Sequence, residues 1–161
     1  MIKNLFRLRK TSPRLEQLRG LSLFGELSPS ERAIVDGLLH ERDYLKDEVI
    51  FDEGEEGQAI YIVLDGEVVI CRQGDPAKGR LATLGPGSFF GDVALLDNTP
   101  RTAQARATTN CRLAVFFRAD FHELMRTHGL IASKISLQLA RGMGARLREA
   151  ARAAPATHQH L

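Results

Sequence analysis

The sequence predicts an α+β fold in which helices flank an antiparallel β-roll, that is, a jelly roll of two sheets. Helix start signals occur at both ends of the chain, and short apolar runs separated by glycine-containing turns lie between them. Several short strands at even spacing are typical of a barrel or a double-sheet jelly roll. At 161 residues the chain is long enough for one domain with a substantial core.

Two helix starts are predicted in the first quarter of the chain. Ser12 precedes Pro13, which is the order of an N-cap and a first helical residue. The same order recurs at Ser28-Pro29, and Glu31 follows at the spacing of a capping box. This second helix is expected to run to about Leu39.

After His40 the pattern changes to short strands punctuated by glycine. Asp65-Gly66 is a strong hairpin signal. The run before it, 59–64, is apolar on both faces and therefore predicts a central strand. The expected strands are 48–51, 59–64, 67–72, 80–84, 104–107 and 111–117.

Two helices are predicted at the C-terminal end, one around 119–125 and a long one over about 130–153. An apolar residue recurs every four positions along the long helix, at Ile131, Ile135, Leu139, Met143 and Leu147. Further apolar residues occupy its other faces, and such a helix needs two partners. The β-roll is one candidate, and a second subunit or a ligand is the other.

The charge is unevenly distributed. Residues 1–19 hold six of the 22 basic and one of the 20 acidic side chains, so the remainder carries a net charge of −3. A total of +2 is too small to argue for nucleic acid. We divide the chain into a basic arm with a helix start (1–19), one folded domain (20–153) and a flexible tail (154–161). The arm is expected to fray or to pack on its own domain, and the alternative is an amphipathic contact with a membrane or partner.

Several classes of function are not expected. Cys71 and Cys111 have no metal-ligand spacing and are interpreted as free thiols of a cytosolic protein. No apolar run is long enough to span a membrane, and the start lacks a signal-peptide core; these features predict a cytoplasmic protein. The histidines lie outside the predicted strand core or at its first edge, and no nucleophile-histidine pattern is present, so neither a metal site nor an enzyme is predicted.

Residues 90–103, Phe-Gly-Asp-Val-Ala-Leu-Leu-Asp-Asn-Thr-Pro-Arg-Thr-Ala, contain the parts of a buried anion site. Gly91 lets the backbone approach a ligand closely. Residues 92–96 are expected to form one helical turn with free N–H groups. Arg101 supplies a permanent planar charge that can hold a phosphate through two hydrogen bonds, and Pro100 fixes the chain just before it. The pattern predicts a pocket for a phosphate monoanion attached to an apolar or aromatic body.

This stretch closely resembles the phosphate-binding cassette of the cyclic nucleotide-binding domain family. The family pattern runs Phe-Gly-Glu, apolar, Ala-Leu, several loop residues, Pro-Arg, small, Ala, and the interval from Gly91 to Arg101 matches it without insertion. The resemblance extends over roughly residues 20–150. It implies N-terminal helices, a β-roll with the inserted cassette, and two C-terminal helices. Residues 138–141 are similar to the dimer helix of catabolite activator regulators.

The resemblance also implies roles for individual residues. Arg101 would pair with the cyclic phosphate, and the N–H of Ala94, with that of Val93, would donate to it. Asp92 stands where the family has a glutamate that bonds the ribose 2′-hydroxyl, and its side chain is one methylene shorter. Leu95 would couple the cassette to the last helix. The full set of expected ligand contacts is Phe90, Gly91, Asp92, Val93, Ala94, Arg101, Thr102, Ala103, Ile70, Leu81, Ala82 and Leu84.

The last helix is expected to act as a lid over the base. Met143, Arg146 and Leu147 are its candidates, and Arg146 either stacks on the base or is a solvated surface residue. The hydroxyl of Thr102 is compatible with cGMP, whereas the likeness to bacterial regulators favours cAMP.

The predicted function is a stand-alone sensor for cAMP or cGMP that signals through its C-terminal helix, as a homodimer or with a partner protein. Two alternatives remain open. A degenerate domain would keep the fold as an interaction or dimerisation module without binding. The effector half of a transcription regulator would need a helix-turn-helix after Leu161, because this chain alone has nothing that reads bases.

Overall fold

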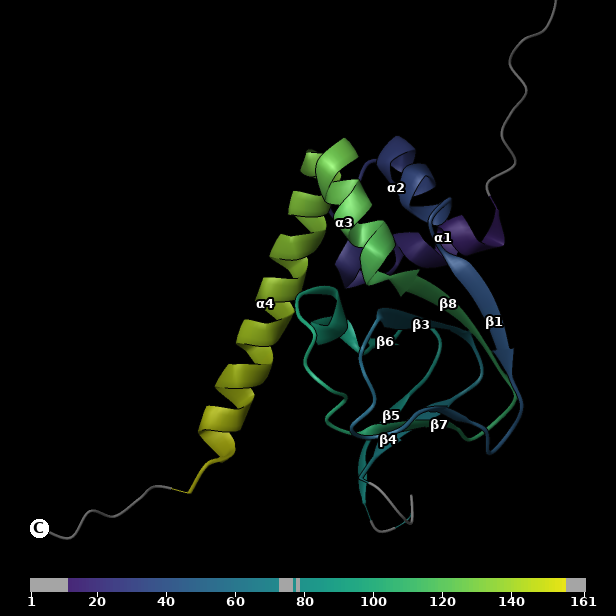
Figure 1. Cartoon of the computed structure of the whole chain (residues 1–161), viewed down its shortest axis with the longest axis vertical. Helices are drawn as coiled ribbons and strands as arrows, with labels where there is room; N and C mark the ends of the chain where they lie inside the picture. The colour runs from purple at the N-terminus through teal and green to yellow at the C-terminus, as the bar shows by residue number, and fades with distance from the viewer. Residues whose placement is uncertain (1–11, 73–76, 78, 156–161) are drawn as a thin grey trace, which may run out of the picture.

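The structure is a computed structural model that describes residues 12–72, 77 and 79–155. The first eleven residues of the basic arm and residues 156–161 of the tail lie outside the described residues, so the predictions made for them stay predictions. In Figure 1 the helices gather at one end of the β-roll, and the last of them runs down its side. The helical elements are α1 (Pro13–Arg19), η1 (Ser22–Phe24), α2 (Pro29–Asp36), η2 (Asp92–Leu95), α3 (Arg118–Thr127) and α4 (Gly129–Ala153).

Two four-stranded antiparallel sheets form the roll. The first has the order β1-β8-β3-β6 and the second the order β2-β7-β4-β5. Their bounds are β1 (His40–Tyr44), β2 (Val49–Phe51), β3 (Ala59–Asp65), β4 (Val68–Cys71), β5 (Arg80–Leu84), β6 (Phe89–Phe90), β7 (Gln104–Ala107) and β8 (Cys111–Phe117). The predicted α+β jelly roll with flanking helices is therefore confirmed.

Local signals place both N-terminal helices correctly. The hydroxyl of Ser12 accepts from the N–H of Leu15, and the capping box between Ser28 and Glu31 is complete. The second helix, α2, ends at Asp36 rather than near residue 39. The chain turns at 37–39 instead, through hydrogen bonds of successive N–H groups to α2 carbonyls, and enters β1 directly.

The sequence of one strand, β1, lacks the apolar residues from which the other strands were predicted. Its sequence is His-Glu-Arg-Asp-Tyr, and its first four residues are exposed. It is an edge strand that pairs along its whole length with β8, so backbone hydrogen bonds rather than side-chain burial keep it in the sheet.

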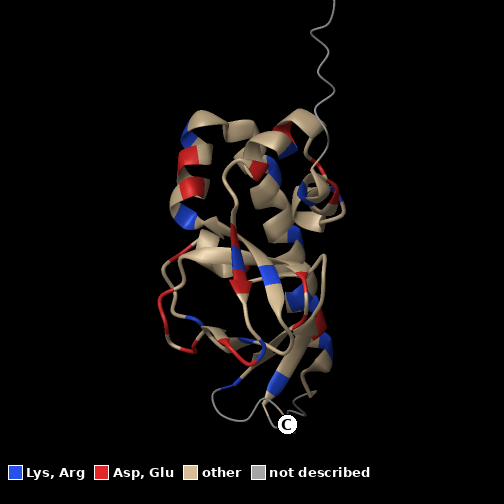
Figure 2. Ribbon diagram, turned by 90° about the vertical axis from the view of Figure 1, so that its right-hand side faces the viewer, with Lys and Arg blue, Asp and Glu red and all other residues tan. Residues whose placement is uncertain are grey.

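The core is divided between two places. Apolar residues of the helices pack on the first sheet, and a second cluster that includes Phe51, Phe90 and Leu113 lies within the roll. The apolar stripe of α4 is buried only as far as Leu139, because the helix then runs beyond the other helices (Figure 1), and Leu147 is 72% exposed. Within the described ranges, none of the helices combines the length and the apolar character needed to cross a bilayer. Basic and acidic residues are interspersed along the ribbon in Figure 2.

Candidate anion-binding site

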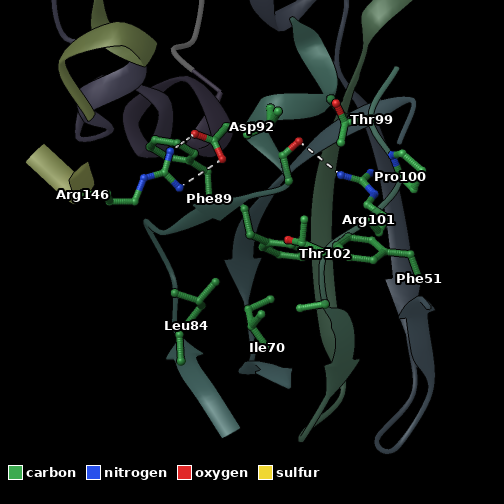
Figure 3. Close-up of a pocket in the computed structure, with 16 residues that line it drawn as sticks. Phe51, Ile70, Leu84, Phe89, Asp92, Thr99, Pro100, Arg101, Thr102 and Arg146 are labelled. Carbon is green, nitrogen blue, oxygen red and sulfur yellow. Dashed lines mark hydrogen bonds and ion pairs between the residues drawn. The ribbon is translucent and has the colours of Figure 1, made fainter. Parts of the chain in front are cut away.

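A cavity of about 470 Å³ lies between η2, the second sheet and α4. This volume is within the range of sites for small organic ligands. Figure 3 shows its residues, and the cavity has a polar end at Asp92 and Arg101 and an apolar end at Ile70 and Leu84. The lining residues are Phe51, Ile70, Ala82, Leu84, Phe89, Phe90, Gly91, Asp92, Val93, Ala94, Thr99, Pro100, Arg101, Thr102, Ala103 and Arg146.

Gly91 begins the turn that is predicted to hold an anion, residues 91–97, called the anion-binding turn below, and this position has to be glycine. Its φ of 77° lies in the left-handed region, and a Cβ atom there would stand 2.5 Å from Nη1 of Arg101 and 3.2 Å from the carbonyl oxygen of Ala59. Only a residue without a side chain allows this approach. The predicted helical turn follows as the 3₁₀ helix η2, one residue shorter than expected.

Arg101 is a buried cation with an incomplete set of partners. Only 9% of it is exposed. Its Nη1 donates to the carbonyl oxygen of Gly91 (3.2 Å) and its Nη2 to that of Ala59 (2.8 Å), while Nε has no acceptor among the described residues. Its Cζ lies 4.1 Å from the ring centroid of Phe51, a cation–π distance. Burial lowers the pKa of the guanidinium from its ordinary value, but an arginine remains protonated in proteins.

No carboxylate forms an ion pair with Arg101 in the part of the chain that the structure describes. A buried charge without a counter-charge is costly. The guanidinium is therefore suited to pair with an anion that enters the cavity.

The N–H of Ala94, predicted to face a phosphate, donates to the carbonyl oxygen of Gly91 (3.1 Å). That oxygen thus accepts from both Ala94 and Arg101. Two of the expected phosphate donors thus share one carbonyl oxygen, and an incoming anion would have to compete with that oxygen for them.

Asp92 and Arg146 close the cavity on the α4 side (Figure 3). Asp92 is 5% exposed, and its carboxylate accepts from Arg146 at two points, one of them 3.3 Å between Nη1 and Oδ1. Arg146 therefore reaches the cavity through this carboxylate, and its role as a lid residue stays a prediction. Its stacking on a base stays a prediction.

The structure gathers most of the predicted site residues around the cavity, but not all of them. Leu81 does not line it and is 57% exposed, because alternate side chains of β5 face opposite ways and Ala82 and Leu84 take the inner face. Met143 and Leu147 of α4 do not line it either. Leu95 lies behind the cavity, fully buried in the cluster that holds the first half of α4.

Four residues that line the cavity were not among the predicted ligand contacts, namely Phe51, Phe89, Thr99 and Pro100. Thr99 and Pro100 precede Arg101 directly, so their proximity could have been inferred. Phe51 comes from β2, fifty residues before Arg101, and no local pattern indicates that its ring lies against the guanidinium.

Comparison with known proteins places these features in a family. A model described as "Cyclic nucleotide-binding domain" matches residues 41–128. The chain is 38% identical over 134 residues to the cyclic AMP receptor protein of Thermus thermophilus, covering 83% of this chain and 60% of that protein. The chain spans 60% or less of the length of this relative and of three further ones.

Solved structures agree with the sequence comparison. A cyclic nucleotide-binding domain from Methylobacillus flagellatus superposes with a TM-score of 0.73 at 27% identity, covering 91% of this chain and 84% of that one. The regulatory domain of Toxoplasma gondii PKA, crystallised with cAMP, has a TM-score of 0.65 at 25% identity, covering 79% and 48%. The family model covers more than half of the chain and contains the whole anion-binding turn. The chain therefore belongs to the cyclic nucleotide-binding domain family.

Proposed function

We propose that the cavity binds one molecule of cAMP or cGMP, with the cyclic phosphate at Arg101, and that the chain acts as a regulatory module rather than as a catalyst. One observation carries this proposal. Arg101 is buried beside Gly91 with its Nε unpartnered, and no carboxylate forms an ion pair with it in the described part of the chain.

The rest of the cavity suits the remainder of a cyclic nucleotide. Ile70, Ala82 and Leu84 form an apolar wall away from Arg101 (Figure 3), which fits a sugar edge and a base. Asp92 offers an acceptor for a ribose hydroxyl. The relative from Thermus thermophilus is named as a cyclic AMP receptor, and the Toxoplasma gondii domain was solved with cAMP, which favours cAMP over cGMP as the ligand of this chain.

The proposed output is the position of α4. The second half of α4 extends past the other helices (Figure 1) and carries Leu147, which is 72% exposed. In the first half of the helix, Leu130 and Leu137 are 65% and 50% exposed. These side chains offer a surface for a second copy or another protein. A ligand that binds one α4 position better than another would change this surface by shifting the population of the two positions.

A thermal-shift titration of nucleotide-free protein tests binding. A ligand at a hundred times its Kd stabilises by about 2.7 kcal/mol, which should raise Tm by roughly 5–10 °C for a domain of this size. The shift should disappear in Arg101→Met and persist in Arg112→Met, which alters an exposed arginine of β8. A wild-type Tm that neither cAMP nor cGMP changes would favour a degenerate domain without ligand.

A further inference from the structure

A second arginine, Arg118, lies at the other end of the anion-binding turn from Arg101. It is the first residue of α3, directly after β8, and its side chain is only 16% exposed. Its Nη1 donates to the carbonyl oxygens of Asp97 (2.8 Å) and Ala94 (3.3 Å), at the end of η2 and just after it. Arg101 contacts the beginning of the same turn, at the carbonyl of Gly91. The turn is therefore held between two guanidinium groups.

The same Nη1 of Arg118 also donates to the carbonyl oxygen of Gly57 (2.8 Å), in the connection between β2 and β3. This glycine fits closely against the turn, because a Cβ atom on it would lie 2.9 Å from Cβ of Ala94 and 3.5 Å from Cζ of Arg101. The backbone N–H of Arg118 donates to the backbone carbonyl oxygen of Gln58 (2.8 Å). One side chain thus connects the turn, the segment that supports it and the start of α3.

These contacts satisfy acceptors that the turn itself leaves free. The last carbonyls of a short helix have no partner within the helix, and a cation near them is favourable. The three carbonyl oxygens share the two hydrogens of Nη1, and the planar guanidinium fixes the directions in which those hydrogens point. Glu56, whose carboxylate is 3.7 Å from Nη2, is 61% exposed and so provides only a weak additional tie.

We propose that Arg118 is a positioning residue that fixes η2 for anion binding and ties it to α3, and through α3 to α4. Its effect on nucleotide affinity rests on the proposed function. Arg118 and the buried Leu95 hold the turn in different ways. The leucine side chain packs in the helical core, while Arg118 fixes the backbone carbonyls of the turn by hydrogen bonds.

The test measures the order of the turn directly, by amide hydrogen exchange of the ligand-free full chain. In Arg118→Met the N–H groups of Ala94, Leu96 and Asp97, which close the turn, should exchange at least tenfold faster. The exchange rates of the amides that pair β3 with β8 should rise only as far as the loss of global stability explains. Arg118→Lys should recover part of the protection, and Arg112→Met, in the neighbouring strand, should leave the turn unchanged. If Arg118→Met does not fold, the lysine variant supplies the comparison.

Calorimetric titration with cAMP completes the test, with Arg118→Met expected to bind about tenfold more weakly than Arg112→Met. The proposal is overturned if the turn amides of the folded variant exchange as in Arg112→Met, or if they exchange faster while the affinity is unchanged. If the wild type binds neither cAMP nor cGMP, the proposed function fails, and the exchange data still decide whether Arg118 orders the turn.

Discussion

Arg146 on α4 forms a two-point ion pair with Asp92 at the start of η2, and this pair joins the exposed half of the last helix to the anion-binding turn. The two partners differ in environment, since the Asp92 side chain is 7% and the Arg146 side chain 57% exposed. Asp92 is the residue proposed to bind the ribose hydroxyl. A ligand that engages Asp92 therefore acts on the same carboxylate that holds α4, which gives a direct physical route from the cavity to the helix.

Replacing Arg146 by Met should weaken cAMP binding by about tenfold, or about 1.4 kcal/mol. The change leaves the buried charge of Asp92 uncompensated beside a site for an anion, and the exposure of Arg146 keeps the loss moderate. Calorimetric titration provides the affinity, and Arg148→Met, an exposed arginine of the same helix, is the control. Equal affinities of the two variants would show that the ion pair does not contribute to binding.

Replacing Asp92 by Ala should abolish the preference for cAMP over 2′-deoxy-cAMP, because the carboxylate is the proposed acceptor for the ribose hydroxyl. Asp92→Glu should retain the preference. The ratio of the two dissociation constants measures the effect independently of any overall loss of affinity. An unchanged ratio in Asp92→Ala would remove this residue from ribose recognition.

Replacing Gly57 by Ala should impair the site without any direct contact to the cavity. The added Cβ would stand 2.9 Å from Cβ of Ala94, and relieving such an overlap typically costs about 1–3 kcal/mol. Chemical denaturation should show the loss of stability, and titration should show weaker nucleotide binding. Gly85→Ala is the matched control, because nothing lies within 4 Å of its added Cβ. If both variants behave alike, the fit of Gly57 against the turn has no consequence.

The attachment of α4 to α2 should depend on pH through Glu31. Its carboxylate accepts from Lys134 (2.9 and 3.0 Å) and from the N–H of Ser28, and these bonds lower its pKa. A carboxyl group with a lowered folded-state pKa stabilises the protein above its unfolded pKa, near pH 4.3, and this contribution is lost as the pH falls through the folded value. Glu31→Gln should therefore lower Tm at neutral pH and reduce its decline on acidification. Glu149→Gln, on the exposed part of α4, should follow the wild type. A Glu31→Gln curve parallel to the wild type at all pH values would contradict the assignment.

The fold was predictable where its signals are local. Neighbouring residues in the sequence specify the helix caps at Ser12 and Ser28. They also specify the hairpin turn at Gly66, whose φ is 87°. The strand β1 was not, because an edge strand held by backbone pairing needs no apolar pattern.

In the candidate site, too, the contacts between residues close in sequence were predictable, whereas those between distant residues were not. Gly91 and Arg101 lie ten residues apart in one motif, and the structure brings them into contact. The pairing of Asp92 with Arg146 and the contact of Phe51 with Arg101 join distant parts of the sequence. They depend on how α4 and β2 pack, which no local spacing encodes.

Arg101 is proposed to hold the phosphate of a cyclic nucleotide. Isothermal titration of the nucleotide-free chain with cAMP and cGMP, in the wild type and in Arg101→Met, tests it most directly. We expect saturable binding of one nucleotide per chain and a loss of affinity of at least a hundredfold, or about 2.8 kcal/mol, in Arg101→Met. Binding of equal strength in both proteins would contradict it.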